Sequence, residues 1–321
     1  MRKFAFVFPG QGSQSVGMLD AWGDHPVVLE TLQEASEALS EDVAQLIRLG
    51  PKEALALTTN TQPVMLVAAV ATYRVWMAET GVAPFAVAGH SLGEYSALVA
   101  AGVLTLTQAA PLVRYRAQVM QEAVPVGVGA MAAILGLEAV KVIAGCAEVM
   151  RSFAENSTEM VEAVNFNDPQ QTVIAGSKAA VERACEMLKA LGAKRALLLP
   201  VSAPFHSSLM KPAAERLRKK MESVKFLPPQ IVVINNVDVA VEVDVNRIRD
   251  ALYRQAFRPV RWVECVKAIR AQGLTAVVEC GPGKALAGMI KRIDSELNGM
   301  VLLDPASLAV LKNELLSADH E

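Results

Sequence analysis

The sequence predicts an α/β fold in which a mainly parallel sheet is interrupted by a smaller unit. Three observations support this prediction. Short apolar runs alternate with helical patterns in the first and last parts of the chain, tight Gly and Pro turns separate them, and the middle of the chain has a different order of elements. The length of 321 residues corresponds to about two domains at roughly 150 residues each.

The first part of the chain alternates strands with helices. Strands are predicted from short apolar runs that end at Gly, Pro or polar residues, and a buried helix from a longer run that is apolar nearly all round. The expected elements are a strand at residues 4–8, helices up to residue 49, a buried helix at residues 64–77, a strand at residues 85–88 and a helix at residues 94–101.

The middle of the chain predicts a βαββαβ unit, which is the ferredoxin-like arrangement. Its expected elements are strands at residues 131–135, 161–165, 171–175 and 195–199 and helices at residues 138–150 and 178–191. The α/β alternation then resumes, with strands expected at residues 231–234, 276–279 and 300–303 and helices at residues 246–256 and from residue 284. We therefore expect a discontinuous larger subdomain at residues 1–128 and 201–321, and a small one at residues 129–200.

Composition narrows the class of protein. Apolar residues make up 52% and charged residues 20%, which excludes a disordered chain, a collagen and a coiled coil. The net charge of −2 gives no general attraction to nucleic acid or to an anionic membrane. Four scattered cysteines without C-x-x-C spacing predict neither a metal site nor a disulfide framework. The first apolar run is too short for a secretory leader, so we expect a cytoplasmic protein.

A G-x-S-x-G pattern lies between a predicted strand and a predicted helix, at Gly89-His90-Ser91-Leu92-Gly93. A nucleophilic serine needs such a sharp turn, because its Oγ must stand clear of the sheet. The N–H of Leu92 would then face a developing oxyanion. The alternative is an ordinary glycine-rich turn between strand and helix.

A nucleophilic serine also needs a base, and the chain has only four histidines. His25 lies in a polar helical region, His320 is the penultimate residue, and His90 is adjacent to Ser91 and would instead line the pocket. His206 is left as the candidate base, against the alternative of a structural histidine. It follows the last strand of the insertion, downstream of the serine as in hydrolases.

The loop after the first strand, Phe8 to Gln14, should lie at the same sheet edge as Ser91. It does not match G-x-G-x-x-G, so phosphate binding is unsupported. We expect it to supply a second oxyanion N–H, from Gln11, unless it is only a structural turn.

Longer motifs identify a family. In order and spacing the sequence resembles the malonyl-CoA:acyl carrier protein transacylases of type II fatty acid synthesis over essentially its full length. The motifs that carry the resemblance are FPGQGSQ, TNTQP, GHSLGEYSALVAAG, RYRAQVMQEA, VNFNDPQQTVIAG, PFHSSLM, NNVD and VECGPGKAL. The resemblance implies a hydrolase-like core interrupted by a ferredoxin-like subdomain, and an acyltransferase that needs no cofactor, since the CoA and phosphopantetheine thioesters are its substrates.

The resemblance also implies roles for single residues. Ser91 corresponds to the nucleophile that carries malonyl as an ester, and His206 to the base. The backbone carbonyl of Gln255 corresponds to the group that orients this histidine, and the N–H groups of Gln11 and Leu92 to the oxyanion hole.

Substrate recognition is implied at a second set of residues. Arg116 corresponds to the arginine that pairs with the free malonyl carboxylate, because a guanidinium offers a planar fork that an acetyl group leaves unpaired. Arg114 is a nearby decoy, and the alternative for Arg116 is a solvated helix face. Phe205 resembles a residue that goes with malonyl selection. Asn165 and Asn167 are candidates for contact with the acyl or pantetheine portion, or are turn asparagines.

Basic residues would meet the acidic carrier protein, where charge complementarity speeds encounter. The candidates are Lys194, Arg195, Lys284, Lys291 and Arg292. The alternative for each is a solvated surface position.

The sequence thus predicts malonyl transfer from malonyl-CoA to acyl carrier protein by a ping-pong route, without a metal. Three alternatives stay open. They are a serine hydrolase or thioesterase with the same turn, a related acyltransferase of polyketide synthesis or malonate decarboxylation, and a non-catalytic module that binds carrier protein. The last is disfavoured because Ser91, His206 and Arg116 are all present.

Overall fold

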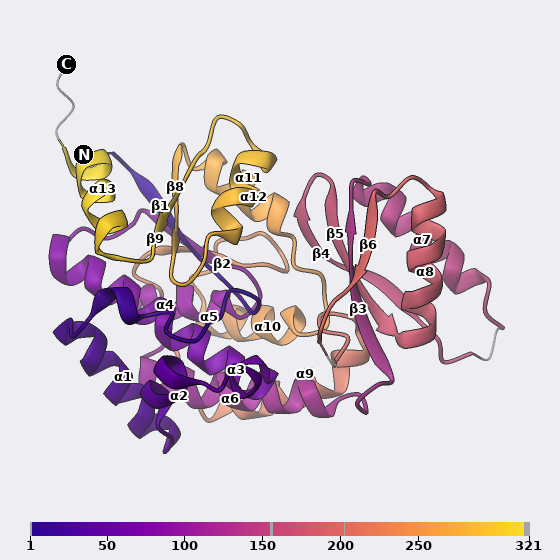
Figure 1. The fold of residues 1–321 in the computed structure, drawn as a ribbon, viewed down its shortest axis with the longest axis horizontal. Helices are drawn as coiled ribbons and strands as arrows, with labels where there is room; N and C mark the ends of the chain where they lie inside the picture. Colours follow the sequence, from indigo (N-terminus) through magenta and orange to yellow (C-terminus); the bar gives the residue numbers. More distant parts are fainter. Residues whose placement is uncertain (1, 155–156, 202, 318–321) are drawn as a thin grey trace.

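The computed structural model describes residues 2–154, 157–201 and 203–317. Within these residues the chain forms one parallel sheet of five strands, in the order β7-β2-β1-β8-β9, and one antiparallel sheet of four strands, in the order β4-β5-β3-β6. The two sheets lie side by side along the long axis of the molecule (Figure 1). The predicted α/β class, with a parallel sheet and a separate small sheet, is confirmed.

The inner strands of the parallel sheet are buried on both faces. Its strands are β1 (Phe4–Phe8), β2 (Ala86–Gly89), β7 (Val232–Ile234), β8 (Ala276–Cys280) and β9 (Asn298–Leu302). Every residue of β1, β2 and β8 is buried. Such continuous apolar strands are typical of parallel sheets, because helices cover both faces.

Alternate residues of β1 contact two different sets of helices. Phe6 and Phe8 point to the face where Tyr73 of α4 makes edge-on ring contacts with both. Ala5 and Val7 point to the opposite face, in the cluster that α11 and α12 complete. This period of two places an apolar layer on each side of the sheet.

The helices around the parallel sheet come from both segments of the chain. They are α1 (Pro26–Leu39), α2 (Val43–Leu49), α3 (Lys52–Ala56), α4 (Thr58–Thr80), α5 (Gly93–Ala100), α6 (Leu106–Glu122), α9 (Lys211–Glu222), α10 (Val245–Gln255), α11 (Trp262–Ala271), α12 (Ala285–Ile293) and α13 (Pro305–Leu316), with short 3-10 turns η1 (Asp20–Trp22) and η2 (Ser208–Met210).

The helices differ from the sequence prediction in two ways. Helix α4 begins at Thr58, before the expected residue 64, and carries Pro63 inside it. Pro63 removes one backbone hydrogen bond near the start of the helix, and burial of the residues that follow outweighs that loss. Helices α6, α9, α11 and α13 were given no range from the sequence. The signal for α11 was present, since Trp262, Cys265, Val266 and Ile269 are buried at helical spacing.

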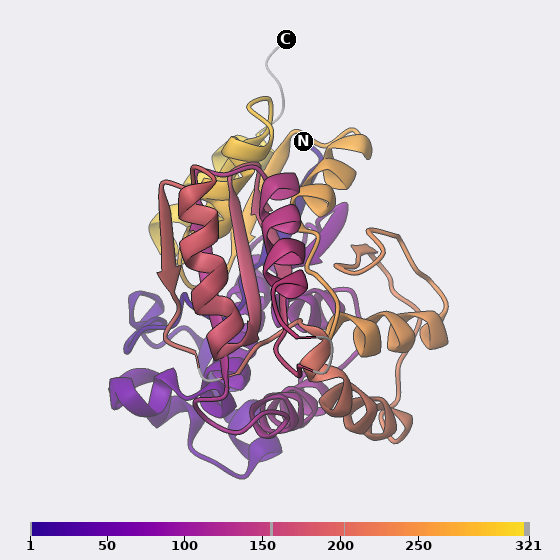
Figure 2. The same cartoon turned by 90° about the vertical axis from the view of Figure 1, so that its right-hand side faces the viewer.

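The antiparallel sheet and its two helices have the predicted βαββαβ order. Their bounds are β3 (Gly129–Leu135), α7 (Ala139–Arg151), β4 (Val161–Asp168), β5 (Gln171–Ser177), α8 (Lys178–Ala190) and β6 (Arg195–Leu198). Both helices cover the outer face of this sheet (Figure 2), where Ala132, Ile134 and Ile174 pack against them. The alternate residues Met131 and Val173 face the parallel-sheet side. The exact boundaries at residues 129 and 200 stay a prediction.

Strand β4 joins the two parts of the molecule. The N–H of Phe166 donates to the carbonyl of Val260 at 3.0 Å, and the N–H of Val260 donates to the carbonyl of Val164 at 2.8 Å. One strand of the small sheet is therefore held beside the segment that precedes α11, and its carboxyl end lies next to the carboxyl edge of the parallel sheet.

Candidate active site

The turn from β2 to α5 holds Ser91 in a conformation that few side chains adopt. Its φ is 52°, in the left-handed region, which is uncommon for a residue with a side chain. The flanking glycines are required by close packing. A Cβ on Gly89 would lie 1.9 Å from the carbonyl of Gly93, and one on Gly93 would lie 2.1 Å from the carbonyl oxygen of Phe8. The G-x-S-x-G spacing is therefore a steric requirement of this turn.

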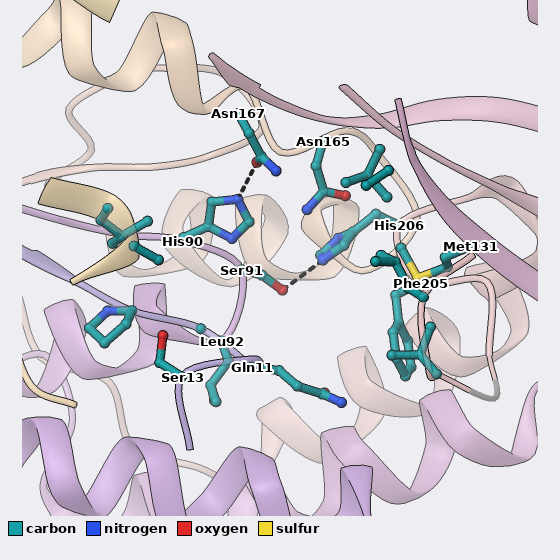
Figure 3. A pocket seen from close by; sticks show the side chains of 18 of the residues that line it. Gln11, Ser13, His90, Ser91, Leu92, Met131, Asn165, Asn167, Phe205 and His206 are labelled. Carbon is teal, nitrogen blue, oxygen red and sulfur yellow. Dashed lines mark hydrogen bonds between the residues drawn. The ribbon is translucent and has the colours of Figure 1, made fainter. Parts of the chain in front are cut away.

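Ser91 and His206 meet from opposite parts of the chain. The Oγ of Ser91 lies 2.6 Å from Nε2 of His206, and a dashed line marks this hydrogen bond in Figure 3. The Nδ1 of His206 lies 2.8 Å from the backbone carbonyl oxygen of Gln255, the last residue of α10. The carbonyl can only accept, so Nδ1 carries the proton and Nε2 is free to take one from the serine.

His206 is buried and unusually acidic. Burial, and to a smaller extent the charge of Arg116, lowers its pKa to about 3. The imidazole is therefore neutral over the whole physiological range, which is the state in which it can act as a base. Its φ of 65° shows a second non-glycine residue held in the left-handed region at this site.

Arg116 lies at the base of the same site and is 1% exposed. Its Nη1 donates to Oε1 of Gln62 at 2.6 Å, and its Nη2 donates to Oε1 of Gln255 at 3.1 Å and to Oγ of Ser91 at 3.2 Å. Arg114 instead points outward and donates two hydrogen bonds to the carboxylate of Glu41. Of the two arginines, the structure brings Arg116 to the serine.

A cavity of about 250 Å³ lies between the two sheets and contains these groups. Its walls come from the β1 and β2 loops on one side and from the small sheet on the other. The lining includes Gln11, His90, Ser91, Leu92, Arg116, Met131, Asn165, Asn167, Phe205 and His206. Every predicted catalytic or substrate-contacting residue except Gln255 therefore lies in its wall, and Gln255 lies directly behind His206.

The loop predicted to supply a second oxyanion donor lies against the serine turn. A Cβ on Gly10 would lie 2.6 Å from the carbonyl oxygen of His90, so the two loops touch. None of the hydrogen bonds between described residues uses the N–H of Gln11 or of Leu92. Both N–H groups thus belong to loops at the cavity and are available to an oxyanion; their role stays a prediction.

Substrate-contact candidates from the small sheet have distinct environments. The Nε2 of His90 donates to Oδ1 of Asn167 at 2.8 Å (Figure 3). The ring of His90 also packs edge-on against Trp262. Asn165 is buried, and its Oδ1 has no partner among the described residues. Asn167 is thus engaged with His90, whereas the side-chain oxygen of Asn165 is buried without a hydrogen bond to any described residue.

The basic residues predicted to meet a carrier protein are all exposed. Arg292 is already engaged within the chain, because its Nε donates to Oδ2 of Asp168 at 2.7 Å and so links α12 to β4. His320, which was weighed as a base, lies outside the described residues.

Sequence reasoning assigned no role to three buried polar residues around the serine. Gln62 contacts Arg116, Glu94 accepts from the side chain of Gln255, and Asn236 Oδ1 accepts from the N–H of Ser91 at 2.8 Å. All three lie within motifs that carry the family resemblance, namely TNTQP, GHSLGEYSALVAAG and NNVD. The motifs were therefore a signal, but spacing alone did not show which residue in each faces the site.

The described residues contain neither a metal-binding cluster nor a membrane-spanning helix. No group of three or more His, Cys, Asp and Glu side chains is arranged to hold a metal ion. No helix is long and apolar enough to cross a membrane.

This fold and site define an acyltransferase. The chain belongs to the acyl transferase domain family, whose model matches residues 5–301. It is 51% identical to the malonyl CoA-acyl carrier protein transacylase of Escherichia coli (strain K12) over 310 residues, which cover 96% of this chain and 98% of that protein.

Solved structures give the same result. The acyl-carrier-protein S-malonyltransferase of Burkholderia pseudomallei 1710b is 62% identical with a TM-score of 0.93, covering 96% of this chain and 98% of that one. A malonyl-transacylase solved in complex with a type II PKS acyl-carrier protein is 49% identical with a TM-score of 0.93, covering 98% and 99%.

Proposed function

We propose that this acyltransferase moves a malonyl group from malonyl-CoA to the phosphopantetheine thiol of acyl carrier protein, through an ester on Ser91. One observation carries the proposal. The Oγ of Ser91 lies 2.6 Å from Nε2 of His206 and 3.2 Å from Nη2 of Arg116, so a nucleophile stands between a base and a buried cation that fits a carboxylate. The names of the relatives agree with this substrate.

The first half-reaction forms the ester. His206 Nε2 takes the Ser91 proton as Oγ attacks the thioester carbonyl, and the N–H groups of Gln11 and Leu92 stabilise the oxyanion. The carbon–sulfur bond then breaks, and His206 returns the proton to the CoA sulfur. In the second half-reaction His206 takes the proton of the pantetheine thiol, the sulfur attacks the ester, and Ser91 leaves with that proton.

Arg116 recognises the malonyl group through its free carboxylate. That carboxylate neutralises the charge that helps to lower the pKa of His206, so the correct acyl group also makes the base stronger. An acetyl group leaves Arg116 without this partner, which penalises the wrong substrate.

The small subdomain, residues 129–200, forms the other wall of the cavity. We assign Asn165 and Asn167 to contact with the acyl or pantetheine portion, and Phe205 to acyl-group selection. Lys194, Arg195, Lys284 and Lys291 are exposed and complement an acidic carrier protein. No resident cofactor is part of this scheme.

The product supplies malonyl units for fatty acid synthesis. We place the reaction in the cytoplasm, where thiols stay reduced, and the four cysteines are free and buried. One solved relative serves a polyketide carrier, so a polyketide carrier is the second acceptor to test.

Intact-mass analysis tests the proposal. The purified chain is mixed with malonyl-CoA, and then with holo acyl carrier protein. We expect a malonyl adduct on Ser91 that the carrier protein removes and acquires. Release of free malonate at the same rate without carrier protein would instead identify a hydrolase, and the absence of any adduct would exclude acyl transfer through Ser91.

A further inference from the structure

Glu94 is a buried carboxylate beside the nucleophile that the proposed reaction does not use. It lies in the first turn of α5, three positions after Ser91, and is 2% exposed. Its Oε2 accepts hydrogen bonds from the N–H of Asn236 at 3.0 Å and from Nε2 of Gln255 at 2.9 Å. Among the described residues no cation pairs with it directly. An unpaired buried carboxylate is costly, which calls for a reason to place one here.

The second partner of Glu94 shows what it does. The Nε2 of Gln255 donates to Glu94 and also to the backbone carbonyl of Ser91 at 2.9 Å. A primary amide has one donor end and one acceptor end. With the donor end taken by these oxygens, the acceptor Oε1 of Gln255 is turned toward Nη2 of Arg116, at 3.1 Å.

Arg116 consequently has only neutral partners. Gln62 and Gln255 each offer an amide oxygen, and Ser91 offers its hydroxyl. No carboxylate among the described residues contacts the guanidinium. The Arg116 guanidinium is therefore held in place while its charge remains available to an incoming carboxylate. A carboxylate in direct contact would instead compete with the substrate.

We propose that Glu94 is a positioning residue, which sets the orientation of the Gln255 amide and through it aims Arg116 at the free carboxylate of the acyl group. The Gln255 amide lies between Glu94 and Arg116. The negative charge of Glu94 therefore favours the charged guanidinium without forming a direct ion pair that would compete with the substrate carboxylate. This inference rests on the proposed function, because it concerns the selection of malonyl over acetyl groups.

The substitution Glu94→Gln tests this role. Glutamine keeps one acceptor oxygen for the N–H of Asn236 and the Nε2 of Gln255 but carries no charge, so both hydrogen bonds weaken and the Gln255 amide is held less firmly against Arg116. The matched control is Glu279→Gln. Glu279 is also fully buried, and it accepts the N–H of Ala287 at 2.8 Å at the start of α12, with no link to Arg116.

The measurement is the rate of Ser91 acylation by malonyl-CoA and by acetyl-CoA, expressed as the ratio of the two kcat/KM values. We expect Glu94→Gln to lower this ratio by about tenfold or more, a change of the size of one lost charge-assisted hydrogen bond. Glu279→Gln should leave the ratio within about twofold of wild type, which is within the effect of substitutions away from the site. An unchanged ratio in folded Glu94→Gln would overturn the inference.

A double substitution distinguishes an effect of Glu94 through Arg116 from a non-specific disruption of the active site. In the Arg116→Ala background, adding Glu94→Gln should not change the ratio further, because the residue through which Glu94 acts is gone. Full additivity of the two effects would show that Glu94 acts elsewhere and would overturn the inference.

The wild-type enzyme gives a test that does not depend on the folding of any variant. Burial raises the pKa of Glu94 to about 7, so acidification protonates it and produces the neutral state that glutamine imitates. The malonyl to acetyl ratio should therefore fall as the pH decreases through about 7, and Glu279→Gln should keep this step. A ratio that is constant from pH 5.5 to pH 8.5 would overturn the inference.

The other groups around Glu94 do not titrate in this interval. Arg116 stays charged as a guanidinium. Burial raises the pKa of Tyr95 to about 12 and also that of Cys265, while Arg254 lowers the pKa of Asp238. Wild-type enzyme that forms no malonyl adduct would overturn the proposed function together with this inference. Wild-type enzyme that is malonylated, with Glu94→Gln unchanged, would overturn the inference alone.

Discussion

The two sheets of this molecule are covered in different ways. Helices pack on both faces of the parallel sheet, where every residue of the inner strands β1, β2 and β8 is buried, whereas the antiparallel sheet has its two helices on one face and the cavity on the other. The parallel sheet carries the Ser91 turn and the Gln11 loop. The antiparallel sheet carries Asn165 and Asn167, which face the cavity across from them.

This difference matches two roles, which are to hold the reacting atoms and to line the opposite wall of the cavity. Reacting atoms must be held within fractions of an ångström, and a sheet covered on both faces provides that rigidity. The groups that line the other wall belong to a sheet with one face toward the cavity and one toward its helices, and they lie across from the reacting atoms. We therefore expect substitutions at the parallel-sheet edge to change chemistry, and substitutions at the junction of the two sheets to change stability slightly.

The largest effect should follow Ser91→Ala. Removing the nucleophilic oxygen should lower transfer by about six orders of magnitude or to the detection limit, while the fold is retained. Steady-state transfer, intact mass and thermal unfolding check this. The serine at position 96 of α5, also buried, is the control: Ser96→Ala should keep the malonyl adduct. A malonylated Ser91→Ala protein would place the nucleophile elsewhere.

Arg116→Ala should have the next largest effect. The loss of a buried partner for the malonyl carboxylate should lower kcat/KM for malonyl-CoA by about 10²- to 10³-fold, with a much smaller change for acetyl-CoA. Arg114→Ala is the matched control, because Arg114 pairs with Glu41 on the outside of the same helix. Equal decreases in kcat/KM for malonyl-CoA and acetyl-CoA would show that Arg116 does not recognise the malonyl carboxylate.

The pH dependence of acylation should show no titration step at the usual histidine pKa of about 6.5. The folded pKa of His206 is lowered to about 3, so the imidazole stays neutral, and able to take a proton, as the pH falls through 6.5. With acetyl-CoA, whose acyl group has no carboxylate, kcat/KM for Ser91 acylation should be level between about pH 5 and pH 8. A decline centred near pH 6.5 would show that His206 has an unperturbed pKa or is not the base.

The smallest effect should follow Arg292→Ala at the junction of the sheets. Its side chain is 54% exposed and its partner Asp168 is 6% exposed, so loss of this pair should lower the free energy of unfolding by about 1 kcal/mol or less. Lys291→Ala, on the same helix, should change stability by less than about 0.5 kcal/mol. Denaturant unfolding of the two variants compares them, and an equal effect would show that the pair does not hold β4 to α12.

Much of this architecture could be read from local patterns. The short apolar runs located the strands, and the order of elements in the middle of the chain predicted the βαββαβ unit, because a period of two or 3.6 is set by backbone geometry. The start of α4 was placed too late. Pro63 and the polar residues before it suggest a boundary, whereas in the folded chain Thr58, Thr61, Gln62 and Pro63 are buried and this segment is helical.

The candidate site also contains residues that the sequence predicts and residues that it does not. The turn at Ser91 could be proposed from its two glycines, because the steric need for them is local. His206 could be reached by elimination among four histidines, and Gln255 only through the family resemblance, since a backbone carbonyl leaves no mark in the sequence. The link from Glu94 through Gln255 to Arg116 was not predicted at all.

Local sequence therefore settled the element types, the strained serine turn and the short list of candidate chemical groups, because each depends on residues within a few positions of one another. Folding in three dimensions settled which arginine reaches the serine, which end of the Gln255 amide faces it, and which residue of β4 meets His90. Those outcomes depend on hydrogen bonds between residues 25 to 161 positions apart, and such partners are chosen by packing rather than by spacing along the chain.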